Sequence, residues 1–191
     1  MPKLVDPVQY RKELLWKAFD VLAETSYAKV TTRQLAKAMG ISTGAMYHYF
    51  PSKQALFEQL VEEMGQQDIR ALQAQVAGAE TLSDRLVRLG QFLIDHEAYF
   101  VKQTAIWTDF CMYTDRETVS SNVVLQRVDD RYRQAIADAL GIRDPQVTQF
   151  IWTLVNGVLV EHMGGHASAN FAEQVHLLTQ MLIAYFEKFP L

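Results

Sequence analysis

Apolar residues recur along nearly the whole chain at the three- and four-residue spacing of amphipathic helices. Leu15, Phe19 and Leu22 share one face of the first such segment, which Asp6 opens as an N-cap ahead of Pro7. No segment alternates apolar and polar residues for long enough to compete as a strand. The pattern therefore predicts an all-α protein.

Capping and helix-breaking residues give the expected bounds of these helices. The expected N-caps are Asp6, Thr31, Ser42, Ser52, Thr81, Asp115, Asp144 and either Ser168 or Asn170. The expected ends lie at Gly40, at Pro51, between Val76 and Gly78, near Leu140 and Gly141, and at Gly164 and Gly165. Asp115 is thus expected to open one long helix that runs to Leu140.

The segment from Val30 to Lys53, VTTRQLAKAMGISTGAMYHYFPSK, is the most informative part of the chain. Thr31 and Gln34 have the spacing of a capping box, and Gly40 supplies the left-handed backbone that ends a helix. Ser42 then caps a second short helix. Two short helices joined by a glycine turn predict a helix-turn-helix, whose second helix can lie in a DNA major groove.

This segment resembles the DNA-binding signature of the TetR (tetracycline repressor-like) regulators. The resemblance is dense over residues 10–60, and beyond them it is architectural, a long helical remainder of the usual length. It implies an N-terminal three-helix DNA-binding unit with a helix-turn-helix, followed by a larger helical domain for ligand binding and dimerisation. We expect the domains to be residues 1–57 and 58–191.

The resemblance also implies which side chains meet double-stranded DNA. Thr43 and Ala45 are small enough to approach base edges, whereas Tyr47 and His48 suit phosphates or, for His48, a base edge. Arg33 lies at a helix N-terminus, which favours a phosphate, and it could instead read a guanine. The expected DNA-binding residues are Thr32, Arg33, Thr43, Ala45, Tyr47, His48 and Lys53.

The charge is distributed unevenly along the chain. The net charge is −4, yet residues 1–57 contain eight basic and four acidic residues and so carry +4, which leaves −8 for residues 58–191. The positive part coincides with the helix-turn-helix. An acidic remainder does not oppose DNA binding, because salt screens charges beyond about 10 Å.

The last two predicted helices, one of them the most apolar in the chain, are the expected dimer interface. The resemblance implies that they pair with those of a second subunit in a four-helix bundle, which would match a palindromic operator. Burial of the same residues inside one subunit is the alternative. The expected dimerisation residues are Phe150, Ile151, Leu154, Val158, Leu159, Leu178, Leu182 and Phe186.

Aromatic residues are concentrated in residues 98–113, and this favours a hydrophobic or aromatic effector of the larger domain. Each candidate taken singly fits an ordinary core residue better than a ligand contact. The expected mechanism is a homodimeric repressor that a small molecule releases from its operator. The candidate effector-binding residues are Phe92, His96, Trp107, Phe110, Cys111, Tyr113, Trp152 and Asn156.

Two other kinds of site are weaker hypotheses. Glu161, His162 and His166 have partial metal-ligand spacing, but Gly164 and Gly165 interrupt the helix between the histidines. Cys111 is a lone cysteine without a basic neighbour in sequence to lower its pKa. We therefore expect no metal site and no cofactor.

The sequence has no phosphate loop, nucleophile elbow or HExxH motif, and this argues against an enzyme. The alternatives to a DNA-binding regulator are a helical small-molecule-binding protein or enzyme, or an adaptor, in which the helix-turn-helix is only structural. No apolar run reaches the roughly 18 residues of a membrane span, so we expect no membrane partner. A single cysteine and the absence of a signal-peptide core favour the cytoplasm.

Overall fold

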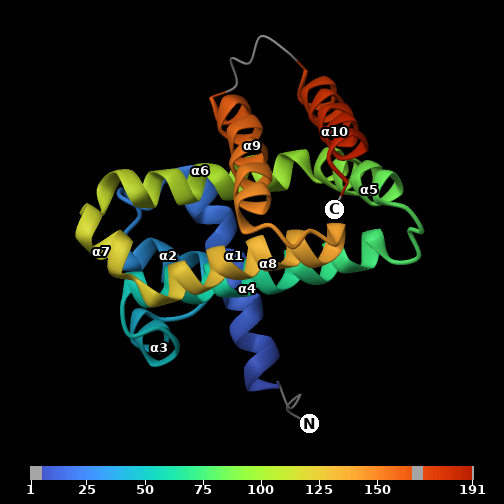
Figure 1. The fold of residues 1–191 in the computed structure, drawn as a ribbon. Coiled ribbons are helices and arrows are strands. Elements are labelled where there is room, and N and C mark those ends of the chain that lie inside the picture. Colours follow the sequence, from blue (N-terminus) through green and yellow to red (C-terminus); the bar gives the residue numbers. More distant parts are fainter. Residues whose placement is uncertain (1–5, 165–169, 191) are drawn as a thin grey trace. The chain divides into compact units, whose positions relative to one another are not determined.

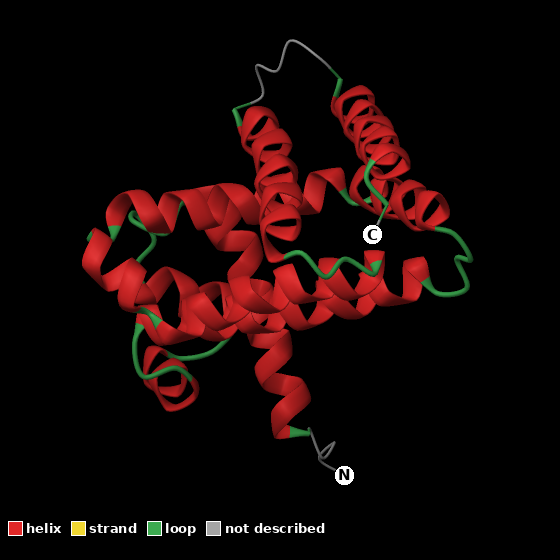
Figure 2. Ribbon diagram, viewed as in Figure 1, coloured by secondary structure: helices red, strands yellow, loops and turns green. Residues whose placement is uncertain are grey.

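A computed structural model describes residues 6–164 and 170–190. All regular structure in these two ranges is helical (Figure 2), which confirms the predicted fold class. The helices in chain order (Figure 1) are α1 (Pro7–Thr25), α2 (Thr32–Met39), α3 (Thr43–Tyr49), α4 (Lys53–Val76), α5 (Leu82–Asp95), α6 (Glu97–Tyr113), α7 (Arg116–Ser121), α8 (Val123–Leu140), α9 (Pro145–Met163) and α10 (Phe171–Lys188).

Most of the predicted helix caps are confirmed. Asp6, Thr81 and Asp144 each accept a backbone N–H at the start of their helices, as expected. Asn170 caps α10 by accepting from the amide of Ala172 at 2.9 Å. Ser168, the other candidate, and Gly165 lie outside the described residues.

One predicted helix is wrong, because residues 115–140 form two helices rather than one. Asp115 caps only the short α7, and the chain breaks at Asn122. The side-chain oxygen of Asn122 accepts from the amides of Val124 and Leu125 at 3.0 and 3.1 Å, so this residue is the N-cap of a new helix, α8. Asparagine competes with the helical backbone in this way, and for that reason it interrupts helices and starts them.

The chain divides into two compact units. Unit 1 consists of Met1–Gln66 and Ile106–Val128, and unit 2 of Gln67–Ala105 and Asp129–Leu191. The unit boundaries fall inside α4, α6 and α8. Residues 106–128 therefore pack with the N-terminal helices, and nothing in the sequence pattern indicated this. A functional boundary at residue 57 remains a prediction.

Unit 1 has an apolar interior to which α1, α2, α3 and the first half of α4 each contribute. Leu35, Ala36 and Met39 bury one face of α2, and Met46 does the same for α3. Phe57 of α4 stacks on Phe110 of α6 with ring centroids 4.1 Å apart. The buried faces of α2 and α3 and this stacked aromatic pair all belong to the apolar interior of unit 1.

Unit 2 has a separate apolar core, which includes residues of α5, α9 and α10. Helices α5 and α10 pack against each other, and Gly90 of α5 lies at a close approach. A Cβ atom at Gly90 would lie 2.5 Å from Oγ1 of Thr179 on α10. A larger residue at position 90 would force these two helices apart.

Candidate functional site

The turn between α2 and α3 is built as the sequence predicts. The Thr31 hydroxyl accepts from the Gln34 amide at 3.2 Å, and the Gln34 side chain accepts from the Thr31 amide at 2.8 Å. Gly40 has a left-handed backbone with φ 74°, and the following amide, of Ile41, donates to the Ala36 carbonyl at 3.0 Å. Ser42 caps α3 by accepting from the Ala45 amide at 3.1 Å. The capping residues thus fix the angle between the two helices.

The outward face of α3 carries the side chains predicted to meet DNA. Tyr47 is 47% exposed, His48 is exposed, and Thr43 and Ala45 are half-buried. Its inward face is closed by Met46, while Phe50, the C-cap residue of α3, is also buried. A short helix with a buried face and a free outer face is the geometry that a major groove accepts.

Arg33 and Thr32 lie at the start of α2. Arg33 is exposed and Thr32 is half-buried. The first amides of a helix point outward and favour an anion at this end. Within unit 1 the structure therefore places six of the seven predicted DNA-binding residues on the two elements that a helix-turn-helix presents.

Lys53 has an internal role that the sequence did not indicate. Its ammonium group donates to the carbonyl oxygens of Tyr27 and Val30 at 2.9 and 3.3 Å. It also lies 4.5 Å from the centre of the Tyr27 ring. Lys53 therefore holds the loop between α1 and α2, and this geometry gives no support to a phosphate contact by its ammonium group.

The same loop is held from α6. The Ala28 amide donates to the Asp109 carboxylate at 3.2 Å. The Tyr27 ring makes edge contacts with Phe57 and Phe110 at 5.1 and 4.9 Å. Burial raises the pKa of Tyr27, so its hydroxyl stays neutral. Residues of α4 and α6 together thus set the position of the loop that leads into α2.

The candidate effector-binding residues do not form one cluster. Trp107, Phe110, Cys111 and Tyr113 belong to unit 1, and the others belong to unit 2. Phe110 is fully buried and stacks on Phe57, whereas Tyr113 is 64% exposed. Burial raises the pKa of the Cys111 thiol, which disfavours the reactive thiolate of a redox sensor.

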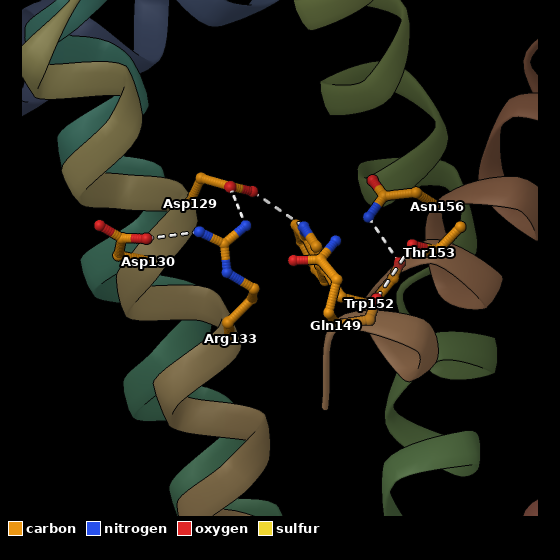
Figure 3. Close-up of polar contacts among 7 residues, drawn as sticks. All are labelled: Asp129, Asp130, Arg133, Gln149, Trp152, Thr153 and Asn156. Carbon is orange, nitrogen blue, oxygen red and sulfur yellow. Dashed lines mark hydrogen bonds and ion pairs between the residues drawn. The ribbon is translucent and has the colours of Figure 1, made fainter. Parts of the chain in front are cut away.

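In unit 2, Phe92 is a core residue and His96 is exposed at the end of α5. Trp152 of α9 donates its indole N–H to Asp129 of α8 at 2.8 Å (Figure 3). Asn156 turns its amide back to the Trp152 carbonyl at 2.7 Å, within its own helix. Trp152 therefore makes a side-chain hydrogen bond to a neighbouring helix.

Arg133 makes two further contacts drawn in Figure 3. Its guanidinium forms ion pairs with Asp129 and with Asp130, both on α8. Asp129 thus forms an ion pair with Arg133 of its own helix and accepts a hydrogen bond from Trp152 of α9. The Trp152 ring also stacks on Tyr132, with centroids 5.2 Å apart and an interplanar angle of 16°.

Asp68 of α4 is a buried carboxylate that the sequence reasoning missed. Tyr99 donates to its Oδ1 at 2.9 Å, Gln103 donates to its Oδ2 at 2.9 Å, and Tyr132 also donates to Oδ2. Burial raises the pKa of Asp68, while these three hydrogen bonds oppose the rise. The signal was present, because Asp68 interrupts an apolar row in which residues recur every four positions, formed by Leu60, Met64, Asp68 and Leu72.

The predicted dimerisation residues divide between the inside and the outside of the chain. Ile151, Leu159, Leu178, Leu182 and Phe186 are buried in the core of unit 2 itself. Leu154 and Val158 are half-buried, and Phe150 is 61% exposed. The exposed apolar stripe of α10 is instead Leu177, Met181 and Tyr185, which recur every four residues. Apolar periodicity alone did not indicate which face of α10 is turned inward.

Two further expectations concern metals and membranes. His162 lies with its Nδ1 2.9 Å from the Val158 carbonyl, and His166 lies outside the described residues. In residues 6–164 and 170–190, no three potential metal ligands come together. No helix in those ranges has both the length and the apolar character that a membrane span requires.

The helix-turn-helix and its exposed outer face define unit 1 as a DNA-binding domain of the helix-turn-helix class. Residues 14–60 match the family model TetR_N, described as bacterial regulatory proteins of the tetR family. This match identifies residues 14–60 as an N-terminal domain of the tetR family.

Curated relatives share only part of this chain. The nucleoid occlusion factor SlmA of Haemophilus ducreyi (strain 35000HP / ATCC 700724) is 41% identical over 70 residues, 34% of this chain and 35% of that protein. The chain thus matches about a third of the length of such relatives. The similarity supports a shared domain rather than a shared overall activity.

Solved structures share the whole fold. A putative TetR-family transcriptional regulator from Rhodococcus sp. superposes with a TM-score of 0.75 at 19% identity, over 93% of this chain and 98% of that one. FadR from Bacillus subtilis, in complex with stearoyl-CoA, gives 0.73 at 15% identity, over 90% and 96%. A putative transcriptional regulator from Saccharomonospora viridis, in complex with choline, gives 0.72 at 18% identity, over 94% and 96%. These likenesses establish the fold and nothing about the ligand of this chain.

Proposed function

We propose that the protein is a transcriptional regulator that binds a specific DNA sequence through α2 and α3. The observation that carries the proposal is the fully capped helix-turn-helix, whose outer face leaves Tyr47 and His48 exposed. The family match over residues 14–60 supports it. The similarity to SlmA covers about a third of either chain, so nucleoid occlusion is not part of the proposal.

The proposed regulator acts as a homodimer. The exposed stripe of Leu177, Met181 and Tyr185 on α10, together with exposed Phe150 on α9, supports an interface with a second copy. A two-fold dimer presents two copies of α3 to successive turns of a palindromic operator. This face replaces the buried side of α10 that the sequence pattern suggested, because residues already buried in unit 2 have little surface left to contribute.

The proposed mode is repression that a small-molecule effector relieves. Structural neighbours of this fold include one in complex with stearoyl-CoA and one in complex with choline, which supports a ligand in the helical part of this chain. Such a ligand changes operator affinity only if it binds one conformation of the dimer better than the other. An effector that saturates the protein and leaves operator affinity unchanged would contradict this mode.

The experiment that tests DNA binding is fluorescence anisotropy with the DNA that flanks the protein's own gene, at two salt concentrations, with a scrambled duplex as control. Tyr47→Ala should weaken specific binding by about 10- to 100-fold, the cost of about 1–3 kcal/mol for a lost groove contact. Tyr113→Ala is the matched control, because Tyr113 is also an exposed tyrosine of unit 1 but lies on α6. Equal, salt-independent binding to both duplexes would favour a helix-turn-helix that is only structural.

A further inference from the structure

Asp68 is the most unusual charged group in unit 2. It is 5% exposed and lies on the buried side of α4, between Met64 and Leu72 in the apolar row. A carboxylate in this position loses the solvation that water would give it. Proteins usually offset that loss with a cation or avoid the charge altogether.

The described hydrogen-bond partners of Asp68 are all uncharged. Tyr99 and Gln103 of α6 and Tyr132 of α8 donate to its two oxygens, and Gln103 also donates to the Tyr132 hydroxyl at 3.1 Å. No arginine or lysine in the described ranges forms an ion pair with it. Since both oxygens accept hydrogen bonds, the cluster is arranged around an ionised carboxylate whose hydrogen-bond partners bring no charge. His96, exposed at the end of α5, is the charged group that acts on Asp68, and its electrostatic attraction opposes the effect of burial on the pKa of Asp68.

The nearby arginine does not supply a countercharge. Arg133 is engaged by Asp129 and Asp130 (Figure 3). Two of the donors to Asp68 are aromatic residues, Tyr99 and Tyr132. A third ring, that of Trp152, stacks on Tyr132. These three rings and Gln103 are half-buried, so the group around the buried carboxylate still has accessible surface.

We propose that Asp68, with the rings of Tyr99, Tyr132 and Trp152, makes unit 2 selective for an organic cation, such as an aromatic or alkyl ammonium compound. This deepens the proposed function, because it names the chemical class of the effector. A buried carboxylate attracts an ammonium group strongly at low local dielectric, and aromatic faces add cation–π attraction. The raised pKa of Asp68 agrees, since the effect of burial exceeds that of the three hydrogen bonds and of His96, which oppose it.

The same arrangement disfavours anionic effectors. A carboxylate or a phosphate ester placed beside Asp68 would bring two negative charges together in a medium that screens them poorly. The three donors of the cluster already point at Asp68 and cannot turn to an incoming anion without leaving Asp68 unsatisfied. The selectivity therefore follows from the sign of one buried charge.

The test compares two probes of the same shape and different charge. Benzyltrimethylammonium carries the cation, and 2,2-dimethylpropylbenzene has a carbon atom in place of the ammonium nitrogen. Isothermal titration calorimetry on the full chain without DNA measures both dissociation constants. We expect the cation to bind at least about tenfold more tightly, a modest share of the attraction between two unit charges in a protein interior.

Two variants should remove the preference. Asp68→Asn keeps the shape and removes the charge. Gln103→Lys brings an ammonium group to the position from which Gln103 reaches Asp68, and so neutralises the carboxylate from within. Asp138→Asn is the control, because Asp138 is an exposed aspartate on α8 that accepts only from Gln134 in its own helix. Circular dichroism identifies the variants that fold, and either folded variant suffices.

The proposal is overturned if the wild-type protein binds both probes equally, if it binds neither, or if a folded Asp68→Asn or Gln103→Lys protein keeps the preference. DNA binding is measured separately by anisotropy. If the protein binds its operator but does not prefer the cation, this inference is wrong and the proposed function stands. If the protein prefers the cation but binds no specific DNA, the proposed function is wrong and this inference stands.

Discussion

The helix-turn-helix of unit 1 and helices α4 and α10 of unit 2 distribute polar and apolar side chains in opposite ways. In unit 1, α2 and α3 bury their apolar residues and expose polar and aromatic groups such as Arg33, Tyr47 and His48. In unit 2, α4 buries a carboxylate, Asp68, while α10 exposes Leu177, Met181 and Tyr185. Burying a carboxylate and exposing a row of apolar side chains each cost free energy, and folding by itself requires neither. The difference agrees with the proposal that unit 2 binds partners through these groups, whereas α2 and α3 present an outward-facing site.

The largest expected effect comes from the exposed apolar stripe. Met181→Glu should prevent dimerisation, because a buried interface would receive an unpaired charge. Operator affinity should fall by more than about 100-fold, because a monomer binds one half-site and lacks the contacts that the second subunit makes with the other half-site. Sedimentation equilibrium gives the mass and anisotropy gives the affinity.

His176→Glu is the control for this change, because His176 is an exposed residue of α10 that lies outside the stripe. If Met181→Glu left the protein dimeric, the exposed apolar stripe of α10 would need an explanation other than a dimer interface.

A second prediction distinguishes the roles of two basic residues of unit 1, Arg33 and Lys53. Arg33→Gln should weaken DNA binding and reduce the slope of log K against log salt by about one, as expected when one phosphate contact is lost. Lys53→Gln should weaken binding by about tenfold while the slope stays the same, because Lys53 positions the loop of Tyr27 and Val30 instead of meeting a phosphate. If the slope changed equally in both variants, Lys53 would be a phosphate ligand after all.

The buried carboxylate predicts how stability depends on pH. Burial raises the pKa of folded Asp68 above its unfolded value of about 3.9, so the folded state binds this proton more tightly. Stability from this group is therefore present at low pH and is lost as pH rises through the folded-state pKa.

Thermal unfolding of the wild type and Asp68→Asn at several pH values above 4 measures this effect. The wild type should lose stability relative to the variant as pH rises. A constant difference between the two proteins would mean that Asp68 titrates as it does in the unfolded chain.

The smallest effect concerns ordinary packing in unit 2. Gly90→Ala should destabilise the protein by about 1–2 kcal/mol, because the new methyl group meets Thr179 Oγ1. Thr179→Ala in the same chain should recover much of this loss by removing the crowded atom. Chemical denaturation measures both values, and an unchanged free energy of unfolding in Gly90→Ala would show that α5 and α10 separate easily.

The local rules of the sequence predicted most of unit 1. The capping box of Thr31, the left-handed Gly40 and the Ser42 cap depend on groups within a few residues of one another, so spacing alone reveals them. The outward positions of Tyr47 and His48 follow from the period of a short helix with one buried side. The same reasoning failed at Asn122, where a side chain competed with the helical backbone.

The sequence by itself determined the helical class, most helix starts and the helix-turn-helix, because these depend on short-range hydrogen bonds and on apolar periodicity. Tertiary structure alone decided the loop-holding role of Lys53, the inward face of α10 and the meeting of Asp68 with Tyr99, Gln103 and Tyr132. These residues are 29 or more positions apart wherever they meet across helices α4, α6 and α8. Periodicity gives a helix its apolar face, but which faces meet depends on how distant segments pack, and that packing is fixed only by the fold as a whole.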